Sequence, residues 1–219
     1  MFQSLVGVLL CFVLVGSVSG QLYGCTSTAI TDYFRHLAYE YHRQYRELIF
    51  NGNAPNKCGG LPKPSNYYQI KYNCDLEQSA INRASQCNAS PSPESSNPDI
   101  GELVSKTYTS EIPVTDTFIQ VFSESVLQAI IATGAGPNAT VTSQIGNWND
   151  VVACGAYQIG CASIPCKTDK KAVMTVCHYR KAGTTSGQIY QVGDGCTSAA
   201  DCTVVAGSTC SGGWCYTPN

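Results

Sequence analysis

Apolar residues recur at three- and four-residue spacing over the first part of the chain and predict a long helix there. Such spacing places the side chains on one face of a helix, where they can pack on a core. The residues concerned are Ile30, Tyr33, Phe34, Leu37, Tyr41, Tyr45, Leu48 and Ile49. The pattern stops at Asn51-Gly52, a pair typical of a helix C-terminus.

Two more helices are predicted further along the chain. The second begins at Asp75, with Gln78 three residues later as a variant of the capping box. Its apolar face consists of Leu76, Ala80, Ala84 and Cys87. The third covers residues 115–133 and stops at Gly134. Its inward positions are Phe118, Val121, Phe122, Ala129 and Ile130.

Strands are predicted only late in the chain. Residues 157–163 and 171–180 are rich in β-branched and aromatic side chains, which is typical of two neighbouring strands. Because the helices come first and the strands follow, an α+β layered domain is favoured over a doubly wound sheet.

An apolar leader precedes these elements. Residues 1–20 carry no charged side chain and end in small residues before Gln21, which predicts a signal peptide and a secreted, extracellular protein. No other stretch approaches the roughly 20 apolar residues that span a bilayer, so no membrane span is expected.

Of the 13 cysteines only Cys11 lies in the leader. The remaining even number predicts a disulfide framework.

Composition divides the mature chain into two parts. Residues 21–192 are long and apolar enough for one domain with its own core. Residues 193–219 carry cysteines among small and polar residues, so this tail cannot bury a core and must be held by disulfides. We expect its four cysteines to pair among themselves; they are Cys196, Cys202, Cys210 and Cys215.

The sequons Asn88-Ala-Ser90 and Asn138-Ala-Thr140 predict glycosylated surface loops.

The charge of the chain excludes one class of partner. The formal net charge is -2 and charged residues make up 13% of the chain, so no nucleic-acid-binding surface is expected.

Catalytic chemistry finds little support in the residues. His36 and His42 are six positions apart, about 600° around a helix, so they do not share a face as a ligand pair would. We expect packing or capping roles for both. His178 lies on a predicted strand without a recognisable nucleophile motif, and an even number of cysteines leaves no spare thiolate. The prediction is a non-enzymatic protein without a cofactor.

Five ordered motifs resemble those of the CAP superfamily, which comprises cysteine-rich secretory, antigen-5 and plant pathogenesis-related proteins. They are HRQYR at 42–46, GNAP at 52–55, IKYNCDLE at 70–77, IGC at 159–161 and VCHY at 176–179. The resemblance covers about residues 22–219 and is greatest to the venom-allergen-like, or activation-associated, secreted proteins of parasitic nematodes. It implies a three-layer α-β-α sandwich with a large central cavity, followed by a short disulfide-rich hinge.

The resemblance also implies a cavity lined by two histidines and two glutamates that can hold a divalent cation. Here the histidine positions fall on Pro91 and Asn147, whereas the glutamate positions keep Glu102 and Glu124. An amide binds transition metals poorly and proline offers no side-chain donor. We therefore expect a degenerate cavity without stoichiometric zinc.

Two disulfides are implied by the same resemblance, namely Cys87 with Cys166 and Cys161 with Cys177. The partners of four further cysteines stay open, and these are Cys25, Cys58, Cys74 and Cys154.

Lipid binding is the function that the resemblance implies, with a sterol near a surface loop or a fatty acid between two helices. Phe118 and Phe122, one turn apart on the third predicted helix, are candidates to line such a groove, and core packing is the alternative. The expected function is a secreted lipid carrier, most plausibly for a sterol. The alternative function is an immunomodulatory ligand of a host cell-surface protein. A channel-blocking or protease-inhibiting role, prompted by the tail, ranks below both.

Overall fold

The structure is a computed structural model. It describes residues 23–57, 59–90, 99–108, 114–122, 127–142, 148–153, 155–169, 171–181, 183 and 186–218. The predicted signal peptide lies outside the described residues, as do Cys58 and Cys154. Pro91, Glu124 and Asn147 of the predicted cavity also lie outside them. No helix within the described part of the chain is long and apolar enough to cross a membrane.

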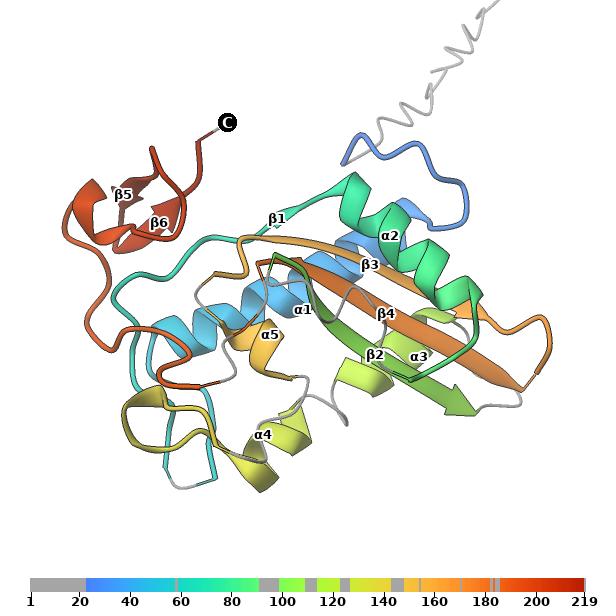
Figure 1. The fold of residues 1–219 in the computed structure, drawn as a ribbon, viewed down its shortest axis with the longest axis horizontal. Coiled ribbons are helices and arrows are strands. Elements are labelled where there is room, and N and C mark those ends of the chain that lie inside the picture. The colour runs from blue at the N-terminus through green and yellow to red at the C-terminus, as the bar shows by residue number, and fades with distance from the viewer. Residues whose placement is uncertain are drawn as a thin grey trace, which may run out of the picture.

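A four-stranded sheet forms the centre of the molecule, in the order β1-β3-β4-β2 (Figure 1). Strand β3 (Gln158–Pro165) and strand β4 (Ala172–Arg180) are antiparallel neighbours, which confirms the two predicted strands. Strand β2 (Gly101–Tyr108) pairs antiparallel with β4, and the short β1 (Lys71–Tyr72) pairs parallel with β3. The sequence did not predict β2, because its second half is only half-buried and carries polar side chains.

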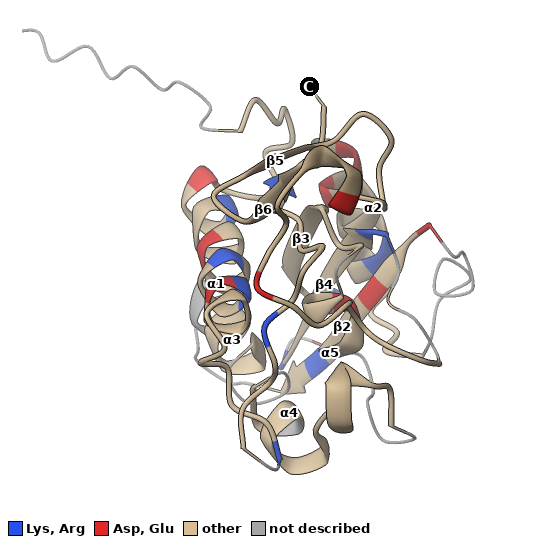
Figure 2. Ribbon diagram, turned by 90° about the vertical axis from the view of Figure 1, so that its left-hand side faces the viewer, with Lys and Arg blue, Asp and Glu red and all other residues tan. Residues whose placement is uncertain are grey.

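The first helix, α1 (Asp32–Phe50), agrees in extent with the sequence prediction, but Tyr33 and Leu48 of the predicted apolar face are exposed. The Thr31 hydroxyl accepts a hydrogen bond from the Phe34 backbone N–H and caps its start. The helix ends before Asn51, and Gly52 follows with φ +71°, a conformation that glycine adopts at little cost. Arg43 forms ion pairs with Glu40 and Glu47 of this helix, which carries both acidic and basic residues along its length (Figure 2).

The second helix, α2 (Cys74–Ser85), starts one residue before the predicted position. The predicted capping box at Asp75 is wrong, because the cap is Asn73, whose side chain accepts from the Leu76 backbone N–H. Gln78 donates instead to Asn82, one turn further along the helix. Several Asx residues close together offer alternative caps, and only the backbone path selects one of them.

The predicted third helix is two shorter helices in the structure, α3 (Val114–Gln120) and α4 (Gln128–Thr133). Val121, Phe122 and Leu127 lie in wider π-helical turns between them. One regular helix over 115–133 is therefore wrong, since an inserted π turn leaves little trace in a 3.6-residue pattern. Gly134, with φ +67°, ends α4 as expected. A further short helix, α5 (Trp148–Val152), was not predicted.

Helices cover both faces of the sheet and make the α-β-α sandwich that the resemblance implied. Successive residues of a strand point to opposite faces. On β4, the Tyr179 hydroxyl bonds His42 of α1, whereas the neighbouring His178 bonds Ser79 of α2. Helix α2 packs directly on the sheet at Gly160. The approach is so close that a Cβ at this position would collide with the backbone of α2.

A buried ion pair connects α1 and α2. Arg35 donates through Nε to Glu77 Oε2 at 2.7 Å and through Nη2 to Oε1 at 2.8 Å. The arginine side chain is 3% exposed and the glutamate 0%, so neither charge has water as a substitute partner. The two-pronged geometry fixes the relative position of the helices.

Among the described residues, disulfides brace the sandwich at three points. Cys87–Cys166 joins the end of α2 to the end of β3, and Cys161–Cys177 crosses between β3 and β4; both are the pairs that the resemblance implied. The structure also pairs Cys25 with Cys74, a choice that the sequence left open. This last bridge fastens the N-terminal segment to the start of α2.

The cysteine-rich tail is a small hairpin docked on the main domain. Strands β5 (Thr209–Ser211) and β6 (Trp214–Tyr216) pair antiparallel. The bridges Cys196–Cys210 and Cys202–Cys215 confirm that the tail cysteines pair among themselves. The Trp214 ring stacks on Phe50 of α1 with 4.1 Å between centroids, and the buried Tyr68 hydroxyl accepts two backbone N–H groups of the tail.

Candidate functional site

Glu102 is the one residue of the predicted cavity tetrad that falls within the described residues. It lies near the start of β2, opposite His178 of β4, and is 6% exposed. Its Oε2 atom accepts a hydrogen bond from Arg83 Nε of α2 at 3.3 Å and lies 3.2 Å from His178 Nε2. The carboxylate is thus held between α2 and the sheet by nitrogen groups.

These neighbours do not suit a divalent cation at Glu102. The Arg83 guanidinium already balances the negative charge of the Glu102 carboxylate. A metal ion at the same oxygen would be repelled by this positive charge. The second carboxyl nearby, Asp150, accepts from the Glu102 backbone N–H at 3.2 Å. Burial raises the pKa of Asp150, and the charge of Glu102 raises it further. Both effects disfavour the charged carboxylate that a divalent cation would require.

Other metal-binding groups are also unsuitable in the described ranges. Two groups of three potential ligands occur there, His42 with Cys161 and Cys177, and the tail cysteines 196, 202 and 215. Every cysteine among them is in a disulfide, which removes the thiolate that metal binding requires.

Ser79, His178 and Glu102 form a hydroxyl–imidazole–carboxylate chain. The Ser79 hydroxyl lies 3.0 Å from His178 Nδ1, and Glu102 lies on the other ring nitrogen. Hydrolases with such a chain also need donors for the developing oxyanion beside the nucleophile. Ser79 is in the middle of α2, where backbone N–H groups bond within the helix. The chain, buried at His178 and Glu102, therefore connects α2 to the sheet, and the position of Ser79 within α2 does not favour hydrolysis.

His42 has the packing role expected from the sequence. It is 0% exposed; its Nδ1 lies 2.7 Å from the Ala38 carbonyl oxygen and its Nε2 lies 2.8 Å from the Tyr179 hydroxyl. A carbonyl only accepts, so Nδ1 carries the proton and Nε2 accepts from Tyr179. Burial lowers the pKa of His42 to about 4 and keeps the ring neutral.

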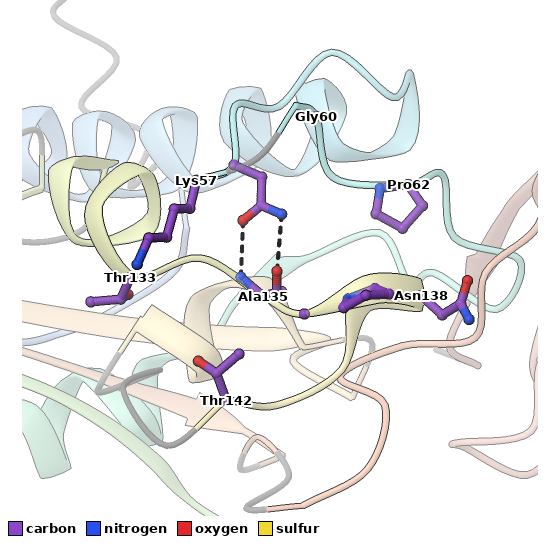
Figure 3. Close-up of a pocket in the computed structure, with 10 residues that line it drawn as sticks. Lys57, Gly60, Pro62, Thr133, Ala135, Asn138 and Thr142 are labelled. Carbon is purple, nitrogen blue, oxygen red and sulfur yellow. Dashed lines mark hydrogen bonds between the residues drawn. The ribbon is translucent and has the colours of Figure 1, made fainter.

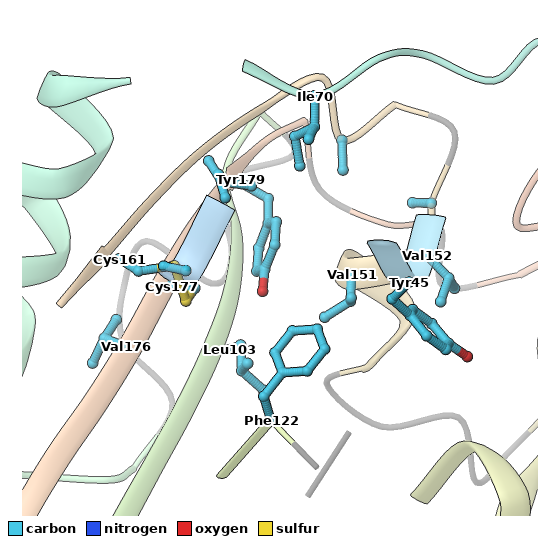
Figure 4. Close-up of a cluster of buried hydrophobic side chains, with 14 of the residues drawn as sticks. Tyr45, Ile70, Leu103, Phe122, Val151, Val152, Cys161, Val176, Cys177 and Tyr179 are labelled. Carbon is cyan, nitrogen blue, oxygen red and sulfur yellow. A yellow bond between two sulfur atoms is a disulfide. The ribbon is translucent and has the colours of Figure 1, made fainter. Parts of the chain in front are cut away.

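Phe118 and Phe122 fill the space between α1 and α3. Both are buried, at 0% and 1% exposed. Phe118 packs edge-on against Phe34 at 5.2 Å between centroids, and Phe122 packs against Tyr41 at 5.6 Å. Figure 4 shows Phe122 inside the cluster of buried side chains, beside Leu103. The core-packing alternative left open by the sequence therefore describes their position, and a ligand between the helices would have to displace them.

A cavity of about 710 Å³ lies instead between two loop segments (Figure 3). One segment carries Asn56 and Pro62, and the other covers residues 133–142. The volume is within the range of small-molecule sites, roughly 300–1,000 Å³. The lining residues are Asn56, Lys57, Gly60, Pro62, Thr133, Ala135, Gly136, Pro137, Asn138 and Thr142.

The amide of Asn56 holds the two segments together. It accepts from the Ala135 backbone N–H at 2.9 Å and donates to the Ala135 carbonyl at 3.0 Å, across 79 positions of sequence. A side chain at Gly134 would collide with Asn56 and Lys57, so glycine permits the close approach. No local sequence pattern predicted this cavity, because its walls are irregular segments brought together by the fold.

A second cavity, of about 280 Å³, lies where the start of α1 meets the end of β3. Ile30 and Phe34 line one side, and Ile164 and Pro165 line the other. It is apolar but small, and its volume falls below the usual range of ligand sites, roughly 300–1,000 Å³.

Comparison with known proteins identifies the family. The sequence pattern of the cysteine-rich secretory protein family, CAP, matches residues 39–179, which is more than half of the chain. The chain belongs to this family. The match spans α1 to β4 and so includes the sheet, Glu102 and the larger cavity. It confirms the resemblance seen in the motifs.

One curated relative is named as a secreted protein, and solved structures share the fold. The Ancylostoma secreted protein of Ancylostoma caninum is 27% identical over 196 residues, which are 85% of this chain and 44% of that protein. This chain therefore spans less than half the length of that curated relative. The crystal structure of Na-ASP-1 superposes with a TM-score of 0.77 at 21% identity, over 90% of this chain and 49% of Na-ASP-1. The hookworm platelet inhibitor gives 0.66 at 21% identity, over 89% and 97%. At such identities the two structures show a shared fold.

Proposed function

We propose that this chain is a secreted CAP protein that binds a lipid, specifically a sterol, without chemical turnover. The observation that carries the proposal is the cavity of about 710 Å³ between the Asn56–Pro62 segment and residues 133–142. The ion pair between Glu102 and Arg83 supports a function that does not depend on a metal ion at this position.

The lining of this cavity suits a rigid apolar molecule with one polar group. Pro62, Ala135 and Pro137 provide apolar walls, and the exposed Lys57 and Asn138 provide polar atoms. Lys57 lies at one end of the cavity, whereas Pro62 and Asn138 lie at the other (Figure 3). Because the Asn56 amide bonds fix the walls in advance, binding would lose little conformational entropy.

A sterol fits the larger cavity better than a fatty acid does. A flexible acyl chain gains less from a wide preformed cavity, since each of its bonds must be ordered on binding. The smaller cavity near Phe34, of about 280 Å³, has less than half the volume of the larger one, of about 710 Å³. We therefore expect cholesterol to bind more tightly than palmitate.

Radiolabelled cholesterol and palmitate test this proposal on wild-type protein and two variants. Pro62→Trp places a large ring in the cavity and should weaken cholesterol binding about tenfold, equivalent to about 1.4 kcal/mol. Pro55→Trp is the matched control, since Pro55 is exposed on the same segment and does not line the cavity. Wild-type protein that binds neither lipid, or a Pro62→Trp variant that binds cholesterol normally, would contradict the proposal.

The second candidate is a protein ligand of a host cell surface. A structural relative named as a hookworm platelet inhibitor motivates it. Saturable binding of delipidated protein to cells, unchanged by Pro62→Trp, would favour this function over lipid carriage.

A further inference from the structure

Asn138 belongs to two features at once. It lines the larger cavity, and it is the acceptor asparagine of the sequon Asn138-Ala-Thr140. The residue is exposed, and its side chain makes no hydrogen bond to any described residue. A glycan attached to its amide nitrogen would therefore begin at the wall of the cavity.

The backbone around Asn138 presents this side chain in a fixed turn. Asn138 has φ +58° and ψ +36°, a left-handed conformation that asparagine tolerates better than most residues. Gly136 and Thr140 pair across the turn, and Gln188 donates to the Asn138 carbonyl oxygen at 3.2 Å. The turn is thus anchored on both sides, so the attachment point of a glycan stays beside the cavity.

The other sequon supplies a natural comparison. Asn88 follows α2 and is also exposed, but it does not line either cavity. Helices α2 and α4 lie on different sides of the molecule in both ribbon views (Figures 1 and 2), so a glycan at Asn88 starts far from residues 133–142. The two sites therefore separate a local effect of glycosylation from a general one.

We propose that an N-linked glycan on Asn138 narrows the entrance of the larger cavity and slows entry of the sterol. This inference rests on the proposed lipid-binding function. A hydrated, bulky oligosaccharide on Asn138 starts at the Pro62 end of the cavity (Figure 3) and occupies space there. The main effect falls on the association rate, because the glycan leaves the inner walls unchanged.

The experiment uses full-length protein secreted by a eukaryotic host, with glycan occupancy determined by peptide mass spectrometry. Association of a fluorescent sterol is followed by stopped flow before and after enzymatic removal of N-glycans from the folded protein. Amidase removal converts the asparagine to aspartate, so Asn138→Asp is the matched genetic variant and Asn88→Asp is the control. Circular dichroism verifies that each protein remains folded.

We expect several-fold faster association after deglycosylation and for Asn138→Asp, and no change for Asn88→Asp. An unmodified Asn138 in the secreted protein, or equal association rates for the modified and unmodified forms, overturns this inference and leaves lipid binding intact. Absence of sterol binding in every form, modified or not, refutes the proposed function and this inference together. Acceleration by Asn88→Asp alone would also overturn it.

Discussion

Acidification should destabilise this protein through His42 of α1. The ring is 0% exposed, and burial lowers its pKa from 6.5 to about 4. In the unfolded chain the imidazole regains its ordinary pKa and binds a proton below about pH 6.5. The folded state binds the same proton only below about pH 4. Between these two pH values the unfolded state binds more protons than the folded state. The free energy of unfolding must therefore decrease as the pH is lowered.

The magnitude follows from the two pKa values. A tenfold difference in proton affinity corresponds to about 1.4 kcal/mol, so the difference between 6.5 and about 4 amounts to about 3 kcal/mol. This contribution is absent above pH 6.5, where the ring is neutral in both states. It grows as the pH falls and is nearly complete at about pH 4. A loss of this size is a substantial fraction of the stability of a typical domain, about 5–15 kcal/mol.

His42→Gln removes the titrating group and tests the reasoning. The variant loses the ring that packs on Phe122 at 4.8 Å, so it should be less stable than wild type at neutral pH by about 1 to 3 kcal/mol. Its stability should nevertheless fall less steeply with acid. The two curves should approach each other as the pH decreases. Acidic groups such as Asp150 titrate in both proteins, so their contribution cancels in the difference.

Urea unfolding followed by circular dichroism, repeated from neutral pH down to about pH 4 with disulfides intact, gives the free energy of unfolding of both proteins. His36→Gln, at the exposed histidine of the same helix, is the matched control and should keep the wild-type pH dependence. A constant difference between wild type and His42→Gln across this range would refute the argument, since it would mean that His42 titrates alike in both states.

Three further predictions concern stability and metal content. Glu77→Ala removes the fully buried partner of Arg35 and leaves the partly exposed Asp32 as its ion-pair partner, so it should cost about 3 kcal/mol in urea unfolding, whereas Glu47→Ala at an exposed pair should cost less than about 1 kcal/mol. Tyr68→Phe removes the hydroxyl that accepts two tail N–H groups, so amide exchange in the tail should accelerate while the sheet stays protected; equal protection would contradict this. Purified protein should contain no stoichiometric zinc by elemental analysis, because Pro91 and Asn147 stand at the histidine positions; tight zinc would show that their placement is wrong.

Local patterns in the sequence determined the regular elements of this protein. The spacing of apolar residues predicted α1 and its end at Asn51-Gly52, since residues three and four apart share a helix face. The β-branched and aromatic runs predicted β3 and β4, because such residues fit a buried pleated surface. The ordered motifs then identified the CAP family and the sandwich that these elements form.

Features that depend on contacts between distant residues could not be predicted from the sequence. Strand β2 has a polar second half, and only pairing with β4 makes it a strand. The pattern showed that Phe118 and Phe122 face inward, but a helix face has the same periodicity whether it meets a core or a groove. Packing against α1 decided for the core.

The candidate site shows the same division most clearly. The resemblance located Glu102 in the sequence. Its partners Arg83 and His178 are 19 and 76 positions away, and only the fold places their nitrogen atoms beside its buried carboxylate. The larger cavity arises where Asn56 bonds Ala135 across 79 positions. Sequence patterns record the preferences of neighbouring residues, whereas charge neutralisation and cavity shape depend on which segments the fold brings together, and these only the tertiary structure decided.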